Sequence, residues 1–177
     1  GAGSTFWAEL PLVSAVTAPQ AATPLQEATV DGVRVLLVED NAVNMLIAAT
    51  MLENWGAVVT QANDGKQAVD LITLLQDNPE TAFDVVLMDV HMPVMSGHDA
   101  TIALRTRYTP QQLPIVALTA AALLNEQDAS MALGMNDFIT KPIDAHLLRN
   151  AVARWGKRHL LPPLQGGEGG NSQSTAL

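Results

Sequence analysis

The sequence predicts an α/β domain in which a parallel sheet is covered by helices on both faces. Short apolar runs alternate five times with amphipathic stretches that are long enough for helices, and this is the order expected of repeated βα units. Most of the runs contain consecutive rather than alternating apolar residues, as strands buried on both faces do. Strict alternation also implies right-handed crossovers, and so a doubly wound fold.

The units follow one another along the chain. The first has an apolar run at 33–38 and a helical stretch at 42–55, which Gly56 is expected to end in the left-handed conformation. The second and third pair the runs 57–61 and 83–88 with helices at 65–76 and 98–107. The fourth pairs 115–118 with 125–133, ended by Gly134, and the fifth pairs 138–140 with 145–158, with Asp144 as the N-cap.

Composition marks the limits of this domain. Residues 13–31 contain two prolines and many small residues without a sustained period, which predicts a flexible linker. Residues 160–177 are rich in Gly, Ser and Pro and are expected to form a disordered tail. The folded domain is therefore predicted over 32–159, an ordinary length for a single domain.

Charge and residue usage exclude several classes of protein. The 177 residues include 9 basic and 18 acidic side chains, a formal net charge of −9, which argues against a nucleic-acid partner. The absence of cysteine excludes disulfides, thiolate zinc sites and iron–sulfur clusters. No apolar run reaches the ~18 residues of a membrane span. We therefore expect the chain to be a cytoplasmic fragment that does not contact a membrane.

Polar side chains gather where the predicted strands end. Glu39 and Asp40 follow the first strand, Asp89 ends the third, Thr119 ends the fourth and Lys141 follows the fifth. The carboxyl ends of parallel strands share one edge of the sheet, where ligands bind. Crowded carboxylates with no sulfur or clustered imidazole favour Mg²⁺. With such an ion, Asp89 could act as a nucleophile toward a phosphoryl group, while Lys141 and Thr119 bind its oxygens.

Four segments together resemble the receiver domain of two-component response regulators. They are VLLVEDNAVN (35–44), VVLMDVHMPVMSGHDA (85–100), PIVALTA (114–120) and GMNDFITKPID (134–144). The set is specific because Thr119 lies 30 residues and Lys141 52 residues after Asp89. The resemblance covers essentially all of 33–159 and implies a flavodoxin-like (βα)5 fold with a five-stranded parallel sheet in the order 2-1-3-4-5.

The resemblance also implies a ligand set and a phosphoacceptor. Mg²⁺ would be held by Glu39, Asp40 and Asp89 together with the backbone carbonyl of His91. Glu39 and Asp40 could also cap and stabilise the N-terminus of the helix that follows them. Asp89 would accept a phosphoryl group from a phosphohistidine. The acidic pair is Glu-Asp rather than Asp-Asp, which keeps both charges.

The same resemblance implies a conformational switch beside this site. Thr119 would move inward on phosphorylation and Phe138 would follow, which would reshape the face formed by the fourth helix, the fifth strand and the fifth helix. The bond between Lys141 and Pro142 is expected to be cis by resemblance. His98 is expected to be a surface residue.

The first twelve residues, GAGSTFWAELPL, resemble the end of the ATP-binding domain of histidine kinases. Followed by a linker and a receiver, they predict the C-terminal fragment of a bacterial-type hybrid sensor histidine kinase. The fragment is expected to lack kinase activity, while its parent would be a protein-histidine kinase anchored in the inner membrane. The alternative is that residues 1–4 are an expression-vector scar.

The predicted function is therefore phosphorelay. The domain would take a phosphoryl group from a histidine kinase and pass it to a histidine phosphotransfer domain, with the helix from Ala42, near Asn44 and Met45, as the docking edge. One alternative is a Mg²⁺-dependent phosphatase of the haloacid-dehalogenase type, although position 91 then holds His instead of the required acid. The other is a receiver-like binding module that is not phosphorylated.

Overall fold

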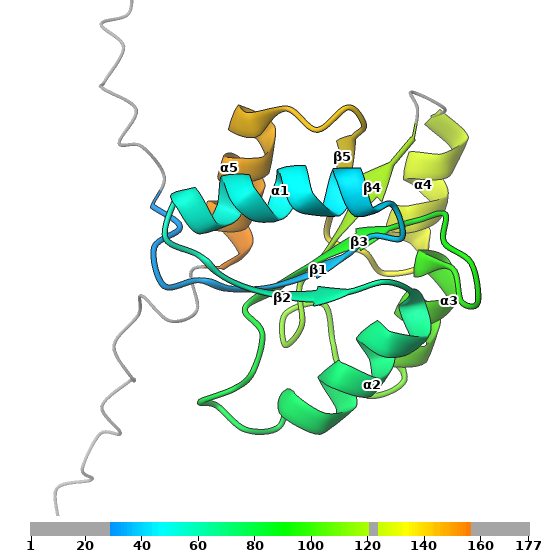
Figure 1. Cartoon of the computed structure of the whole chain (residues 1–177). Helices are drawn as coiled ribbons and strands as arrows, with labels where there is room; N and C mark the ends of the chain where they lie inside the picture. The colour runs from blue at the N-terminus through cyan, green and yellow to red at the C-terminus, as the bar shows by residue number, and fades with distance from the viewer. Residues whose placement is uncertain (1–28, 121–123, 157–177) are drawn as a thin grey trace, which may run out of the picture.

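The computed structural model describes residues 29–120 and 124–156, which form five βα units around one sheet (Figure 1). The strands are β1 (Arg34–Val38), β2 (Val58–Ala62), β3 (Val85–Asp89), β4 (Ile115–Thr119) and β5 (Asp137–Thr140). The helices are α1 (Ala42–Asn54), α2 (Gly65–Leu75), α3 (Gly97–Arg105), α4 (Leu124–Ala132) and α5 (Ala145–Trp155). All strand pairs are parallel and the sheet order is β2-β1-β3-β4-β5, which confirms the predicted fold.

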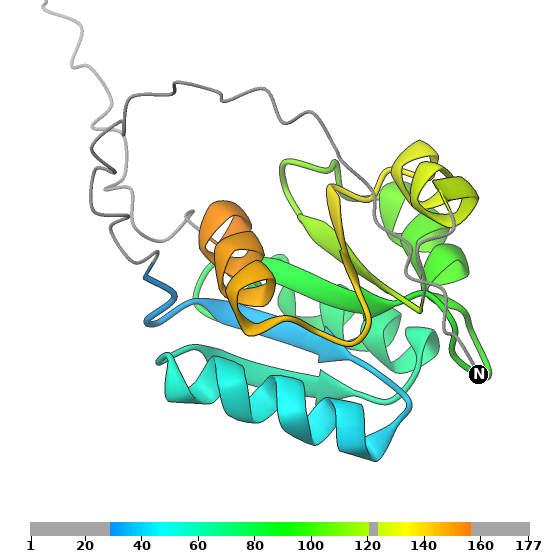
Figure 2. The same cartoon turned by 90° about the horizontal axis from the view of Figure 1, so that it is seen from above.

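Helices cover both faces of the sheet (Figures 1 and 2), and each face has its own core. Val35 and Leu37 of β1 pack in a cluster with residues of α1 and α5. Leu36 and Val38 of the same strand point to the other face and pack with residues of α2 and α3. Because successive side chains of a strand alternate between faces, both sides of β1 must be apolar, which explains the consecutive apolar run.

Local signals set most helix ends, and one differs from expectation. Gly56 and Gly134 have φ values of 88° and 95° in the turns after α1 and α4, as predicted. The side chain of Asp144 accepts hydrogen bonds from the first turn of α5. At α1, however, the N-cap is Asn41, whose side chain accepts from two backbone N–H groups, so the two preceding acids are left for other contacts.

Two of the predicted segments lie beyond what the structure covers. The kinase-like residues 1–12 and the tail 160–177 lie outside the described residues, as does nearly all of the predicted linker 13–31. Among the helices that are described, none has the length and apolar character needed to traverse a lipid bilayer.

Candidate functional site

The predicted polar residues meet at one end of the sheet because the strands are in register. Val38 pairs with Met88, Asp89 pairs with Leu118, and Thr119 pairs with Thr140. Glu39, Asp89, Thr119 and Lys141 lie at or directly after these strand ends, so four adjacent strands carry them to the same edge. The predicted convergence of these side chains is therefore seen in the structure.

Lys141 joins the two buried carboxylates of this edge. Its Nζ atom lies 2.6 Å from Oε2 of Glu39 and 2.6 Å from Oδ2 of Asp89. Glu39 is 2% exposed and Asp89 4% exposed, while the Lys141 side chain is 18% exposed. The backbone N–H of Lys141 donates to the carbonyl of Thr119 at 2.7 Å, and the Lys141–Pro142 bond is cis. A single cation therefore compensates two carboxylates that are nearly out of contact with water.

Glu39, Asp40 and Asp89 form an all-oxygen cluster suited to a hard divalent cation. One oxygen from each of the three lies within 4.8 Å of the others. Glu39 and Asp89 are buried and Asp40 is exposed, so the cluster opens to solvent on one side. Carboxylate oxygens are ligands that Mg²⁺ prefers. The residues present therefore fit a magnesium ion, which would compete with Lys141 for the same oxygens.

Burial and mutual contact shift the pKa values of this ion pair. Burial raises the pKa of the Asp89 carboxyl above its usual range, although the hydrogen bond and charge of Lys141 act in the opposite direction. Burial disfavours the charged form of Lys141, but its hydrogen bonds to Asp89 and Glu39 outweigh this effect and raise its pKa. Lys141 is therefore an ammonium ion at neutral pH and a fixed positive charge beside Asp89.

Thr119, at the end of β4 on the same edge of the sheet, has a buried side-chain hydroxyl. The residue is fully buried, and within the described residues its Oγ1 atom has no hydrogen-bond partner. A buried hydroxyl without a partner costs about 1–3 kcal/mol. Such a group is suited to donate to an incoming oxygen atom.

The loop 90–96 after β3 completes the surroundings of Asp89. The backbone N–H of His91 donates to Oδ1 of Asp89 at 3.1 Å, so the two carboxylate oxygens have different partners. Val94 has a φ of 68° and is 86% exposed. A β-branched residue in the left-handed region is strained, and strain of this kind clusters at functional sites.

Two contributors to the site were not foreseen from the sequence. The Asn44 side chain donates to Oε1 of Glu39 at 3.0 Å and so orients that carboxylate. Gly97, at the start of α3, approaches the strand so closely that an added Cβ would lie 2.1 Å from the carbonyl oxygen of Asp89. The Ser-Gly pair before α3 is the sequence signal that could have indicated this close approach.

Phe138 lies on β5 and is 37% exposed, next to a hollow of about 440 Å³ that Leu147 and Arg154 of α5 also line. Its side chain is thus partly out of the core, while that of Thr119 is inside it. The role of both residues in a switch remains a prediction.

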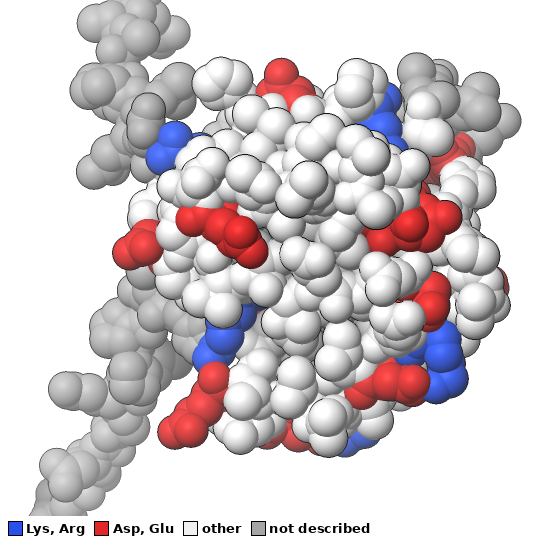
Figure 3. Space-filling view, in the orientation of Figure 1, with Lys and Arg blue, Asp and Glu red and all other residues white. Residues whose placement is uncertain are grey.

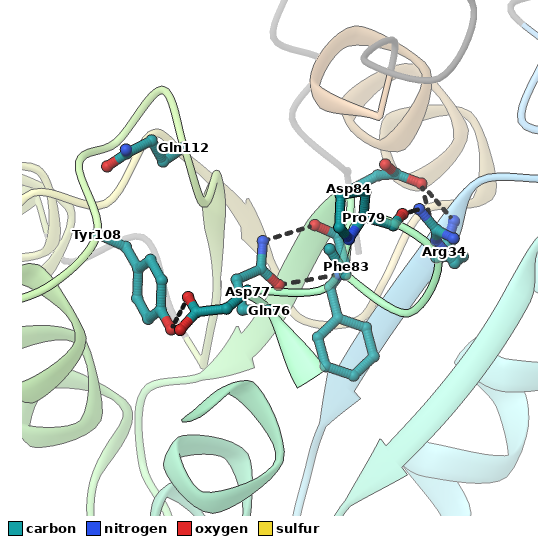
Figure 4. Close-up of a pocket in the computed structure, with 9 residues that line it drawn as sticks. Arg34, Gln76, Asp77, Pro79, Phe83, Asp84, Tyr108 and Gln112 are labelled. Carbon is teal, nitrogen blue, oxygen red and sulfur yellow. Dashed lines mark hydrogen bonds and ion pairs between the residues drawn. The ribbon is translucent and has the colours of Figure 1, made fainter. Parts of the chain in front are cut away.

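A second concavity, of about 370 Å³, lies at the opposite end of the sheet, where β1 and β3 begin (Figure 4). Its polar groups bind one another. The Gln76 side chain exchanges hydrogen bonds of 3.1 and 2.9 Å with the backbone of Phe83, and Arg34 donates to the carbonyl of Pro79 at 2.8 Å. The Tyr108 hydroxyl donates to Asp77 at 3.1 Å. These contacts close the 76–84 loop and indicate a structural role.

The chain is similar to known receiver domains. Residues 35–153 match the family model of the response regulator receiver domain. The sensor protein GacS of Pseudomonas syringae pv. syringae is 43% identical over 125 residues, and Histidine kinase 1 of Arabidopsis thaliana is 35% identical over 153. The matches cover 69% and 70% of this chain, which spans only 13% of the length of each relative.

Solved structures agree with these matches. The receiver domain of a sensor histidine kinase from Pseudomonas aeruginosa, with a magnesium ion coordinated in its active site cleft, has a TM-score of 0.61 and 37% identity, covering 70% of this chain and 97% of that one. A chain in the Saccharomyces cerevisiae co-crystal of the phosphotransfer protein Ypd1 and the receiver domain of Ssk1 has a TM-score of 0.64 and 28% identity. The match covers 76% of this chain and 95% of that one.

Proposed function

The chain belongs to the response regulator receiver family, whose members act in two-component signalling, and from this we propose that Asp89 accepts a phosphoryl group from a phosphohistidine. The observation that carries the proposal is the placement of the Asp89 carboxylate. It is buried at the end of β3 between the Lys141 ammonium and the His91 N–H, and Thr119, at the end of the neighbouring strand β4, has a buried hydroxyl with no partner in the part of the chain that the structure describes.

Each of these groups has a distinct part in the transfer. An oxygen of Asp89 attacks phosphorus, a P–O bond forms and the P–N bond to the donor imidazole breaks. Lys141 binds one phosphoryl oxygen as a point charge, and the Thr119 hydroxyl donates to another. Glu39 lies beside these groups, and the Asn44 side chain donates a hydrogen bond to its carboxylate.

We propose Mg²⁺ as the cofactor of this transfer. Glu39, Asp40 and Asp89 would hold it, together with the backbone carbonyl of His91. When bound, the ion neutralises charge that develops on the phosphoryl oxygens. The support is the all-oxygen acidic cluster and the similarity to the Pseudomonas aeruginosa receiver that contains magnesium.

The exposed face of α1 supports docking of a histidine phosphotransfer domain. Val43, Leu46 and Ile47 are 64%, 66% and 46% exposed, near the start of a helix that contains no basic residue. The surface over α1 is largely uncharged in the space-filling view (Figure 3). A hollow of about 220 Å³ between Ile47 and the segment from Lys141 continues this apolar surface toward Asp89. A partner helix with an apolar face and a reactive histidine would fit here.

We further propose that Thr119 and Phe138 form the switch, since the first is buried beside Asp89 and the second is partly exposed on the neighbouring strand. The parent protein would be a hybrid histidine kinase, with residues 1–12 as the end of its ATP-binding domain. Similarity to the sensor kinases supports this origin. The domain would then lie in the cytoplasm, while the kinase activity and the inner-membrane anchor would belong to other parts of the parent.

One experiment tests the phosphoacceptor proposal. The protein is incubated with Mg²⁺ and acetyl phosphate and then examined for an acid-stable, base-labile phosphoryl group. We expect modification of the wild type and of Asp70→Asn, an exposed control, and none of Asp89→Asn. An unmodified wild type would overturn the proposal and leave the binding-module alternative. Turnover of unrelated phosphate esters would instead favour the phosphatase, which the receiver matches do not support.

A further inference from the structure

Helix α4 is attached to the phosphoacceptor end of the molecule through two histidines. Nδ1 of His91 lies 3.2 Å from Oε1 of Glu126, and Nε2 of His98 lies 2.8 Å from Oγ of Ser130. Glu126 and Ser130 are four residues apart and therefore lie on the same face of α4. Ser130 Oγ also lies 2.9 Å from the carbonyl oxygen of Glu126, so it contacts both His98 and the preceding turn of α4. His98 is thus not a free surface residue.

These polar contacts matter because little of the described part of α4 is buried. Within the described residues 126–132, Ser130 alone is buried. The Glu126 side chain is nevertheless only 15% exposed, whereas the His91 side chain is 70% exposed. The carboxylate of Glu126 is therefore held close to the protein, and it is the group that orients an otherwise solvated imidazole.

The loop that carries His91 contains a strained backbone position. Val94, in the same loop, has a left-handed backbone, which is strained for a β-branched residue. Its side chain is exposed, so no burial of apolar surface offsets that strain. The His91 N–H must nevertheless stay 3.1 Å from Asp89 Oδ1. A tether from α4 to the His91 side chain would oppose relaxation of this loop.

We propose that Glu126 is a positioning residue of the phosphoacceptor site, acting through His91. It fixes the residue whose backbone N–H binds Asp89 and whose carbonyl is proposed to bind Mg²⁺. This inference rests on the proposed function. Since coupling between two sites is reciprocal, binding of Mg²⁺ at Asp89 would also stabilise the docked position of α4.

The test compares four single variants of the whole chain and one double variant, in which Glu126→Ala is combined with His91→Ala. Glu126→Ala removes the tether, Glu126→Gln keeps an acceptor for the His91 Nδ1–H, and His91→Ala removes the imidazole but not the backbone. Asp128→Ala is the matched control, because Asp128 is an exposed acid on the same helix. Hydrogen exchange of the His91 amide is measured by NMR in EDTA, and Mg²⁺ affinity by calorimetry.

We expect Glu126→Ala to accelerate exchange of the His91 amide and to weaken Mg²⁺ binding, each by about 3–10-fold, the range for loss of one hydrogen bond. Glu126→Gln should restore both to within about twofold, and Asp128→Ala should match the wild type. In the His91→Ala background, Glu126→Ala should have no further effect, because the tether acts through the imidazole.

The two proposals fail in different ways. If the wild type binds Mg²⁺ and is phosphorylated but Glu126→Ala behaves like Asp128→Ala, only the role of Glu126 is overturned. Additive effects of Glu126→Ala and His91→Ala would overturn it as well, because they would place the action of Glu126 elsewhere. If the wild type neither binds Mg²⁺ nor accepts a phosphoryl group, the proposed function fails and this inference falls with it.

Discussion

Replacing Lys141 with Met should destabilise the metal-free protein much more than loss of an ordinary lysine. The substitution leaves Glu39 and Asp89, which are 2% and 4% exposed, without the cation that contacts both at 2.6 Å. Breaking a buried ion pair by removing one partner costs about 3–5 kcal/mol. Because the Lys141 side chain is 18% exposed, we expect the lower end, about 3 kcal/mol. For a domain of this size that loss lowers Tm by about 12 °C.

The assay is thermal unfolding in EDTA and again in saturating Mg²⁺. The control is Lys66→Met, which breaks an exposed pair with Asp70 on α2 and should cost less than about 0.5 kcal/mol. Mg²⁺ at about 100 times its Kd adds about 2.7 kcal/mol of stability. The wild type gains this stability too, so at equal Mg²⁺ concentration the deficit of Lys141→Met should shrink because the ion, which neutralises the same carboxylates, binds this variant more tightly than the wild type.

Two outcomes would refute this reasoning. If Lys141→Met and Lys66→Met lowered Tm equally in EDTA, Lys141 would not be compensating buried charge. If the deficit of Lys141→Met were the same in EDTA and in Mg²⁺, the cation would bind the two proteins equally, and it would not compete with Lys141 for Glu39 and Asp89.

Three further predictions concern the backbone around the site and the opposite end of the sheet. Val94→Gly should raise the free energy of unfolding in urea by about 1 kcal/mol, because it relieves a left-handed valine that buries little; a loss of stability would show that the strain is absent. Gly97→Ala should lower that free energy by about 2 kcal/mol, since its Cβ would meet the Asp89 carbonyl oxygen, and an unchanged value would contradict the close approach. Burial and the hydrogen bond to Asp77 raise the pKa of Tyr108 from its usual value near 10, so the folded state keeps a proton that the unfolded state releases. Stability should therefore fall as pH rises above about 10, by at most about 1.4 kcal/mol per pH unit. Tyr108→Phe should flatten this slope, and phenolate absorbance reports the pKa directly because the chain contains a single tyrosine; identical slopes would refute the assignment.

The fold was predictable because its signals are local. Consecutive apolar residues, as in 35–38, favour burial on both faces, and a parallel sheet between helix layers provides that burial. The glycines after α1 and α4 and the aspartate before α5 determine helix ends through backbone contacts a few residues away. The edge that holds the site followed from the same pattern, because parallel strands bring their carboxyl ends together.

The contacts within the site were less predictable because they join residues distant in the sequence. The sequence brings Lys141 to the edge near Glu39 and Asp89, but only the packed sheet shows that its Nζ contacts both carboxylates. Similarly, either acid after β1 could have capped α1, and the choice of Asn41 depends on the path of the turn.

By itself, therefore, the sequence determined the layers of this protein, the order of its elements and the chemical types of side chain at the edge, since these depend on burial and short-range hydrogen bonds. Only the tertiary structure decided which atoms of those side chains meet. The pairing of His91 with Glu126, 35 residues later, is the clearest case. It depends on where α4 rests against the loop after β3, and that position results from the packing of several elements at once.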